Sequence, residues 1–244
     1  MRIDKFLSEL GVASRKAAAQ LAKQGRLTVN GQTIKDSSHH INPEVDTVAA
    51  DGRTLEYKKH LYILLNKPEG YVSATEDRNL PVVTELLPSD IQKRGLFPVG
   101  RLDRDSVGVM ILTNDGDLAH KLLTPKHHVQ KVYFFRCAEP LSPDAEAAFE
   151  SGITLKDGYL CKSARISVSD DRLSGEITLT EGKYHQIKRM IASFNNKVTY
   201  LERKSFARIP IQPLPERGHW RYLSEEEIAS LVSEAARAND GKES

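Results

Sequence analysis

The sequence is poor in cysteine, which argues against a disulfide-bonded or zinc-stabilised protein. Among its 244 residues there are two cysteines, Cys137 and Cys161, with no C-x-x-C spacing. A disulfide framework needs several cysteines and a structural zinc site needs closely spaced ligands, so both are excluded. The histidines form no spaced ligand set either, and we expect no metal site.

Long hydrophobic runs are also missing. No apolar stretch approaches the roughly eighteen residues of a membrane span, and no hydrophobic signal segment follows Met1-Arg2-Ile3-Asp4. These absences argue against membrane and secreted proteins, and we expect a cytoplasmic one. The composition, with 39% hydrophobic and 28% charged residues, fits a globular protein with one large and one small domain.

The net charge of +2 is too small to indicate nucleic-acid binding by itself. Residues 1–26, however, contain six basic residues and two acidic ones, a net charge of +4. Such a concentration is suited to neutralising phosphates, although a solvated helix face is the alternative interpretation. The residues expected to contact a phosphate-bearing partner are Arg2, Lys5, Arg15, Lys16 and Arg26.

The same segment predicts regular structure. Helices are expected at Asp4–Leu10 and Ser14–Gln24, the second with Ser14 as its N-cap. Arg26–Ile34 follows as strand, Asn30-Gly31 turn and strand, which is the strongest short hairpin pattern. Beyond it, the stretch from Asp51 to His60 has few apolar residues, and we expect it to separate two domains near Lys58.

The most informative segment runs from Gly100 to Asp117. Asp103 precedes the apolar run Val107–Leu112, which ends at a polar turn, Thr113-Asn114-Asp115-Gly116. This pattern predicts a loop carboxylate directly before a buried strand, the usual placement of a catalytic group. A solvated ion-pair cluster on the surface remains an equal alternative on these residues alone.

A family resemblance breaks this tie. The segment GRLDRDSVGVMILTNDGDLAHKLLTP resembles the signature of the RsuA-type pseudouridine synthases of ribosomal RNA. Three further segments resemble family motifs in the same order, namely Leu65–Gly70 (N-K-P-x-G), Lys131-Val132-Tyr133 (K-x-Y) and Glu181–Met190 (G-[RK]-Y-H-Q-[IV]-[RK]-R-M). The helices, basic face and hairpin near the N-terminus resemble the S4-like RNA-binding module.

The resemblance and the element pattern together indicate an α+β protein. We expect an S4-like αβ domain at residues 1–58 and a catalytic domain at residues 59–236, with a disordered tail at residues 237–244. Strict alternation of strands and helices is absent, so the central sheet is expected to be mixed or antiparallel and flanked by helices. Further strands are expected at Leu61–Leu65, Lys131–Cys137, Ala164–Val168, Gly175–Thr180 and Lys197–Leu201. Further helices are expected at Asp117–Leu123, Ser142–Ser151, His185–Ser193 and Glu225–Ala235.

The resemblance also implies the chemistry. The family isomerises uridine to pseudouridine, which consumes nothing and needs no cofactor, and Asp103 matches its catalytic aspartate. The sequence does not decide whether this carboxylate acts as a nucleophile or as a base. Lys188 matches the basic residue that keeps the aspartate ionised, although a lysine lacks the bidentate fork of an arginine. A phosphate contact by Lys188 is the alternative.

Other residues are assigned by the same motifs. Tyr133 would stack on the extruded uracil and Leu201 would pack against it, whereas both would otherwise be interpreted as core residues. The substrate-binding residues expected besides Leu201 are Arg101, Arg104, Lys131, His185 and Arg189. The basic residues expected to hold the RNA backbone around the extruded base are Arg101, Arg104, Lys126, Lys131, Lys183, Arg189, Arg203 and Lys204. Asn66-Lys67-Pro68 would form a turn after a strand and support the site from outside.

The favoured substrate is 16S rRNA of the small subunit. The short chain without a long basic tail and the lysine at position 188 resemble the small-subunit enzymes more than the 23S relatives. The partner is therefore ribosomal RNA, either naked or within an assembly intermediate, and we expect a monomer. The alternatives are a 23S enzyme and a non-catalytic RNA-binding or assembly protein. A metal-dependent hydrolase lacks the clustered ligands it needs.

Overall fold

The chain consists of two compact units. The computed structural model describes residues 1–124, 128–214 and 216–236. One unit, here called the N-terminal unit, comprises Met1–His60 and Leu87–Leu96, and the other, the large unit, comprises Leu61–Leu86 and Phe97–Ser244. The tail predicted for residues 237–244 lies outside the described residues.

The N-terminal unit packs two helices on a small antiparallel sheet of order β2-β1-β3-β4. Ser14 caps its second helix, since its hydroxyl accepts from the Ala17 N–H at 3.2 Å. The predicted hairpin is confirmed, because Asn30 and Gly31 have positive φ values of 50° and 78° and lie between two paired strands. Its elements are α1 (Ile3–Glu9), α2 (Arg15–Lys23), β1 (Leu27–Val29), β2 (Gln32–Thr33), β3 (Val48–Ala50), β4 (Arg53–Leu55) and α3 (Ser89–Gln92).

One prediction about this unit was wrong. The stretch after Asp51 was expected to separate the domains, but it contains β4, which pairs with β3. Asp51 and Gly52 both have positive φ, 52° and 76°, the conformation of a type I′ hairpin turn. An Asp-Gly pair therefore marked a second hairpin, although the following Arg53-Thr54-Leu55 is too polar to predict a strand.

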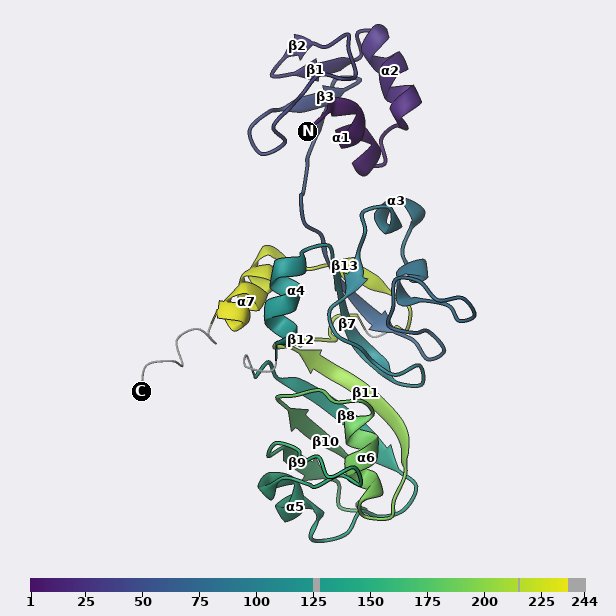
Figure 1. The fold of residues 1–244 in the computed structure, drawn as a ribbon, viewed down its shortest axis with the longest axis vertical. Helices are drawn as coiled ribbons and strands as arrows, with labels where there is room; N and C mark the ends of the chain where they lie inside the picture. The colour runs from purple at the N-terminus through teal and green to yellow at the C-terminus, as the bar shows by residue number, and fades with distance from the viewer. Residues whose placement is uncertain (125–127, 215, 237–244) are drawn as a thin grey trace. The chain divides into compact units, whose positions relative to one another are not determined.

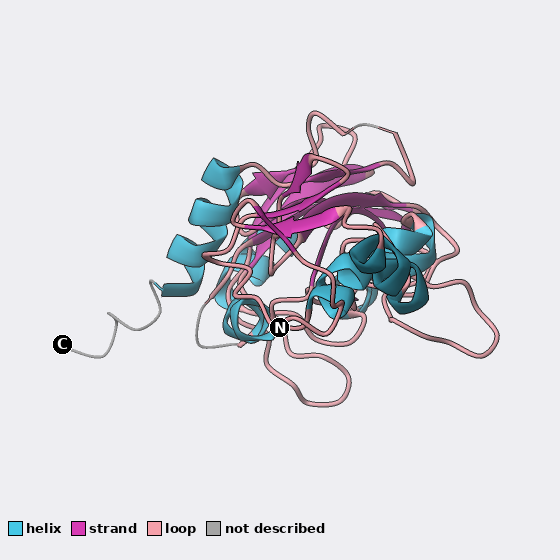
Figure 2. Cartoon of the chain, turned by 90° about the horizontal axis from the view of Figure 1, so that it is seen from above, coloured by secondary structure: helices cyan, strands magenta, loops and turns pink. Residues whose placement is uncertain are grey.

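The large unit is built on a nine-stranded sheet. The twist of its strands is visible in Figure 2, where they are magenta. Its elements are β5 (Tyr62–Lys67), the 3-10 helix η1 (Val83–Leu86), β6 (Phe97–Pro98), β7 (Val107–Thr113), α4 (Gly116–Leu123), β8 (Lys131–Cys137), α5 (Ala145–Ser151), β9 (Arg165–Val168), β10 (Ser174–Leu179), α6 (Gln186–Ala192), β11 (Val198–Phe206), β12 (Ile209–Pro210), β13 (Trp220–Tyr222) and α7 (Glu225–Ala236).

The strand order confirms the predicted mixed sheet. The main path is β13-β5-β7-β11-β8-β10-β9, with β6 beside β7 and β12 beside β11. All the described pairs are antiparallel except β7 with β11, where Glu202 lies opposite Val107 and Arg203 opposite Gly108. This parallel pair places β7, which follows the Asp103 loop, beside β11, which carries Leu201, at the centre of the sheet.

Helices cover the sheet and complete its core. Figure 1 shows α6 lying against the β8, β10 and β11 strands, and α4 beside α7. Leu118 and Leu122 of α4 and Leu231 of α7 share a buried cluster with Ile111 of β7. No helix in the described part of the chain is long and apolar enough to cross a membrane.

Two strand boundaries differ from the predictions. β11 was expected to end at Leu201 but continues to Phe206, and β5 was expected to end at Leu65 but continues to Lys67. Both extensions contain charged residues, Arg203 and Lys67, that are fully or almost fully buried. A charged residue normally predicts a strand end at the surface, so only tertiary partners place these inside.

Candidate active site

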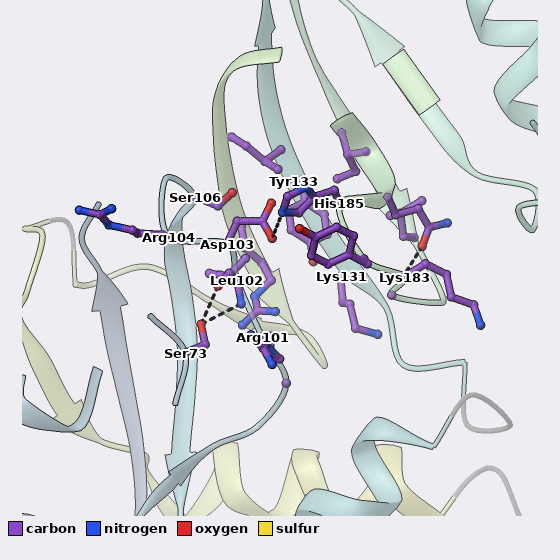
Figure 3. Close-up of a pocket in the computed structure, with 18 of the residues that line it drawn as sticks. Ser73, Arg101, Leu102, Asp103, Arg104, Ser106, Lys131, Tyr133, Lys183 and His185 are labelled. Atoms are coloured by element: carbon purple, nitrogen blue, oxygen red, sulfur yellow. Dashed lines mark hydrogen bonds and ion pairs between the residues drawn. The ribbon is translucent and has the colours of Figure 1, made fainter. Parts of the chain in front are cut away.

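Asp103 lies in the loop between β6 and β7, as predicted. The Ser106 N–H donates to the Asp103 carbonyl oxygen at 3.1 Å and closes a turn directly before β7. Every residue of β7 is buried, so the turn is attached to a rigid part of the core. The Asp103 side chain is 25% exposed and lies at the wall of a cavity (Figure 3).

Lys67 holds the backbone of this loop. Its Nζ donates to the carbonyl oxygens of Asp103 at 3.0 Å, Arg104 at 3.3 Å, Ser106 at 2.7 Å and Pro68 at 3.1 Å. Burial lowers the pKa of Lys67 to about 8 because few water molecules solvate its charge. The segment Asn66-Lys67-Pro68 was expected to support the site from outside, but Lys67 contacts the Asp103 loop directly.

Ser73 holds the other side of the loop. Its hydroxyl donates to the Leu102 carbonyl oxygen at 2.7 Å and accepts from the Leu102 N–H at 2.9 Å, as the dashed lines in Figure 3 show. Together, Ser73 and Lys67 fix the backbone on both sides of Asp103. A carboxylate held in this way needs little reorganisation to act on a substrate.

Lys188 of α6 forms the main ion pair of Asp103. Its Nζ lies 2.9 Å from Oδ2 of Asp103 and 2.6 Å from Oδ1 of Asp105. Burial alone would lower the pKa of Lys188, but its hydrogen bonds to Asp105 and Asp103 outweigh burial and raise it. Burial is the largest single influence on Asp105 and would raise its pKa, but the hydrogen bond from Lys188, the Lys188 charge and smaller contributions together outweigh it and lower that pKa. The lysine is therefore a permanent cation beside Asp103.

His185 approaches Asp103 from the N-terminus of α6. Its Nε2 lies 3.4 Å from Oδ1 of Asp103, and its backbone is left-handed, with φ 49° and ψ 34°. The ring stacks on the exposed ring of Tyr184, with 3.8 Å between the centroids. This strained position turns the imidazole toward the carboxylate rather than along the helix.

A buried carboxylate anchors the loop before α6. Glu181 accepts from the Tyr159 hydroxyl at 2.6 Å, the Lys162 N–H at 3.0 Å and Nε2 of Gln186 at 2.6 Å. Burial raises the pKa of Glu181, but these three hydrogen bonds outweigh it and lower the pKa. Sequence analysis assigned no role to Glu181 or Gln186, although both lie within the fourth motif. Their part is to hold the backbone that carries His185 and Lys188.

Three of the four motifs supply residues to one cavity of about 680 Å³, and the Leu65–Gly70 motif supports it through Lys67. The cavity volume is sufficient for a nucleotide-sized ligand. Tyr133 on β8 and Leu201 on β11 are mostly buried and line it, and Figure 3 shows the Tyr133 ring near Asp103. The predicted residues that line the cavity are Arg101, Asp103, Arg104, Lys131, Tyr133, Lys183, His185, Leu201 and Arg203.

Not every predicted basic residue is exposed at the cavity, and Lys204 does not line it. Arg189 pairs with Asp157 and does not line this cavity. Arg203 was expected to contact the RNA backbone, but it is only 1% exposed, and its Nε donates to the Val109 carbonyl oxygen at 2.7 Å. Arg203 is buried because β11 continues through it into the sheet, and it lines the cavity from there. Lys126 lies outside the described residues.

Gly108 allows the close approach of β7 and β11 beside the site. Its φ is +103°, and a Cβ atom there would lie 2.3 Å from the Arg203 carbonyl oxygen. Any other residue would push β11 away from the Asp103 loop. Gly108, in the motif that contains Asp103, is therefore needed for β7 to pack against β11.

The predicted RNA-binding residues of the N-terminal unit differ in whether they form salt bridges with acidic residues. Arg2 pairs with Asp4 at 2.7 Å, Lys5 with Glu9 at 3.6 Å, and Arg26 with Asp51. Arg15 and Lys16 are exposed on α2, and within the described chain neither forms a salt bridge. No group of three or more metal-ligating side chains occurs among the described residues.

Comparison with known proteins gives one consistent family. The sequence profile of the RNA pseudouridylate synthase family matches residues 61–193, and that of the S4 domain matches residues 1–46. An uncharacterised RNA pseudouridine synthase of Bacillus subtilis (strain 168) is 38% identical over 95% of this chain and 98% of its own length. The ribosomal small subunit pseudouridine synthase A of Escherichia coli (strain K12) is 36% identical over 95% of this chain and 100% of its own length.

A solved structure agrees with these sequence relatives. A crystal structure of a pseudouridylate synthase covers 95% of this chain and 100% of its own, with a TM-score of 0.67 and 33% sequence identity. The family profile spans the Asp103 loop, β8 and the whole of α6, which supply most of the residues that line the cavity. The chain therefore belongs to the RNA pseudouridylate synthase family and carries an S4 domain at its N-terminus.

Proposed function

We propose that this enzyme converts a specific uridine of the 16S rRNA of the small ribosomal subunit to pseudouridine. The observation that carries the proposal is the cavity that joins Asp103, Tyr133 and Leu201 in a chain that matches ribosomal small subunit pseudouridine synthase A over its whole length. A 23S rRNA pseudouridine synthase of the same family would contain the same kind of cavity, so the cavity does not distinguish the two substrates. The full-length match to the small-subunit relative favours 16S rRNA.

Asp103 acts at the anomeric carbon of the ribose. Its carboxylate, ionised beside the Lys188 cation, either attacks that carbon or removes a neighbouring proton while the bond to the uracil nitrogen breaks. The detached uracil turns within the cavity and rejoins the ribose through ring carbon 5. No atom is gained or lost, so the reaction itself consumes nothing.

The remaining cavity residues bind and orient the nucleotide. Tyr133 stacks on the uracil and Leu201 packs against it, which gives the detached base a surface on which to turn. His185 lies beside the second carboxylate oxygen of Asp103 and limits the positions that this oxygen can take. Lys188 is a positioning residue, since it does not line the cavity.

The target uridine must leave the RNA stack to reach Asp103, which costs a few kcal/mol. Arg101 and Arg104 are exposed at the cavity and hold the phosphates around the extruded nucleotide. In the N-terminal unit, Arg15 and Lys16 supply charge that no acidic neighbour neutralises, and Arg2, Lys5 and Arg26 add to it. We place the enzyme in the cytoplasm as a monomer, acting on rRNA alone or within an assembly intermediate.

One experiment tests this function. Small- and large-subunit rRNA are incubated separately with the wild type, with Asp103→Asn and with the matched control Asp105→Asn, and pseudouridine is located by mass spectrometry. Asp105 also pairs with Lys188, but its side chain is 63% exposed. We expect wild type and Asp105→Asn to modify the small-subunit RNA, and Asp103→Asn to be slower by more than about a thousandfold.

Each other result has a definite meaning. Modification of the large-subunit RNA alone would replace 16S by 23S rRNA as the substrate. Full activity of Asp103→Asn would remove Asp103 from the mechanism. Absence of pseudouridine from naked RNA and from ribosomal assembly intermediates would support a non-catalytic RNA-binding role.

A further inference from the structure

Two cations in the cavity have no acidic partner. Lys131 and Arg203 both line it, and within the described chain neither forms a salt bridge. Nζ of Lys131 donates to the Val129 carbonyl oxygen at 2.9 Å. The recorded partners of Arg203 are the Val109 carbonyl oxygen, 2.7 Å from Nε, and the Met110 sulfur, 3.8 Å from Nη2. A guanidinium has five N–H donors, so most of its hydrogen-bonding capacity is unused.

These cations lie beside the same aromatic ring and on the same face of the sheet as Tyr133. Nζ of Lys131 is 5.6 Å and Cζ of Arg203 is 5.2 Å from the centroid of the same ring, that of Phe206. Arg203 lies opposite Tyr133 in the β8–β11 ladder, and Lys131 precedes Tyr133 by two residues. The three side chains therefore project from the same face of the sheet.

This arrangement is unfavourable without an anion. Arg203 is 1% exposed, and two like charges near one ring repel each other while both lose solvent. Burial and the charge of Arg203 lower the pKa of Lys131 to about 8, with Glu181 acting weakly in the opposite direction. At neutral pH the lysine is still mostly protonated, so both charges face the cavity.

We propose that Lys131 and Arg203 stabilise the negative charge on the uracil while it is detached from the ribose. The inference rests on the proposed function. When the glycosidic bond breaks, its electron pair stays on the uracil nitrogen, and the charge spreads over that nitrogen and the two carbonyl oxygens. The anomeric carbon bonds to Asp103, or its neighbouring carbon gives Asp103 a proton. Ring carbon 5 then bonds to the anomeric carbon, either as the bond to Asp103 breaks and restores its carboxylate or as Asp103 returns the proton to the neighbouring carbon. Carbon 5 finally loses its proton and the nitrogen gains one.

The position of the pair favours the base over a phosphate. Tyr133, the stacking surface for the uracil, lies beside both cations, whereas Arg101 and Arg104 are exposed where the RNA backbone passes. Fixed donors aimed at a charge that develops during reaction act most strongly in a site that excludes water. A phosphate contact would instead act equally before and after bond cleavage, and would strengthen RNA binding without favouring the bond-breaking step.

The test compares two leaving groups in single-turnover reactions. Transcripts of the small-subunit RNA carry either uridine or 5-fluorouridine, whose fluorine stabilises the detached anion, and loss of the target nucleoside is followed by mass spectrometry. Lys131→Gln removes the charge and Lys131→Arg restores it. Lys183→Gln changes an exposed lysine at the same cavity. Thermal unfolding checks that each variant is folded.

We expect Lys131→Gln to slow cleavage about a hundredfold on uridine and clearly less, about tenfold, on 5-fluorouridine, because the better leaving group needs less help. Lys131→Arg should recover most of the rate, and Lys183→Gln should weaken RNA binding by the same factor for both RNAs. Equal losses on the two RNAs, or a loss confined to RNA affinity, would overturn the inference while leaving the proposed function intact. A wild type that makes no pseudouridine would overturn the proposed function itself.

Discussion

The two units of this protein carry their charge in different places. Among the charged residues described in the N-terminal unit, only Asp4 is buried, and it pairs with Arg2 at the surface. The large unit buries Lys67, Glu181 and Arg203, each of which forms hydrogen bonds inside the sheet or the loops beside it. The first unit therefore presents nearly all of its charge to solvent, whereas the second also encloses three charged groups.

This difference separates two uses of charge. Surface charge attracts a polyanion over a distance and is screened by salt. Enclosed charge is screened little, and it is costly unless hydrogen bonds or a ligand offset it. Affinity for RNA should thus be distributed over both units, whereas the structure of the site and its chemistry should depend on a few enclosed groups. Four experiments, ordered from the largest expected effect to the smallest, examine this contrast.

Substitution of a lysine by methionine should reduce stability in the large unit and leave it unchanged in the N-terminal unit. Lys67→Met leaves four carbonyl oxygens without their shared donor, so we expect it to lower the free energy of unfolding by about 3 kcal/mol or more. Lys23→Met, on the exposed end of α2, should leave it unchanged. Urea denaturation followed by circular dichroism measures both. Equal stability of the two variants would show that Lys67 does not support the Asp103 loop.

The ion pair at Asp103 should matter through its charge. Lys188→Met removes the cation that lies 2.9 Å from Asp103, so we expect the single-turnover rate of pseudouridine formation to fall by about ten- to a hundredfold. Lys188→Arg keeps a cation in place and should recover at least half of this loss on a logarithmic scale. An equally inactive Lys188→Arg would mean that shape, not charge, is what Asp103 requires there.

Removal of unpaired surface charge should change affinity and its dependence on salt. For the double variant Arg15→Gln/Lys16→Gln, we expect the dissociation constant of the RNA to rise several-fold and the slope of its logarithm against log salt to fall by about 1.5. The single-turnover rate at saturating RNA should change much less. Arg26→Gln is the control, since Asp51 already neutralises Arg26, and it should change the slope less than either single variant of α2.

The enclosed Lys131 should make stability depend on pH. Its pKa is about 8 in the folded protein against an ordinary value of 10.5, so between these values the unfolded chain binds more protons. The free energy of unfolding of the wild type should therefore rise relative to Lys131→Gln as the pH goes from 8 to 10.5, on the order of 1 kcal/mol. Denaturation at pH 7, 8, 9 and 10 measures this, and a constant difference would show that Lys131 titrates as an exposed lysine.

Local patterns were sufficient for much of the fold. The Asn30-Gly31 hairpin, the Ser14 cap and the buried strand after Asp103 follow from turn chemistry and side-chain periodicity, which act over a few residues. The end of β11 and the pairing of β4 with β3 were not predictable in this way. Arg203 looks like a surface residue in the sequence but is buried, and Arg53-Thr54-Leu55 looks too polar for a strand but pairs with β3. Only the strand partners decide these outcomes.

The candidate site likewise combines residues that the sequence predicted with contacts that it did not. The resemblance of the motifs named Asp103, Tyr133, Lys188 and Leu201, and all but Lys188 line one cavity, with Lys188 bound to Asp103 from beside it. It did not show that Lys67 binds the backbone of the Asp103 loop or that Glu181 anchors the residues before α6. Both contacts join segments whose chemistry looks ordinary when each is taken alone.

The sequence by itself determined the family, the presence of an S4 domain and the residue types available for catalysis, because motif order and local turn and helix chemistry are properties of short segments. The tertiary structure alone decided which charges are enclosed and what each one faces. Burial depends on every neighbour at once, so the same arginine or lysine is a surface contact in one place and part of the site in another.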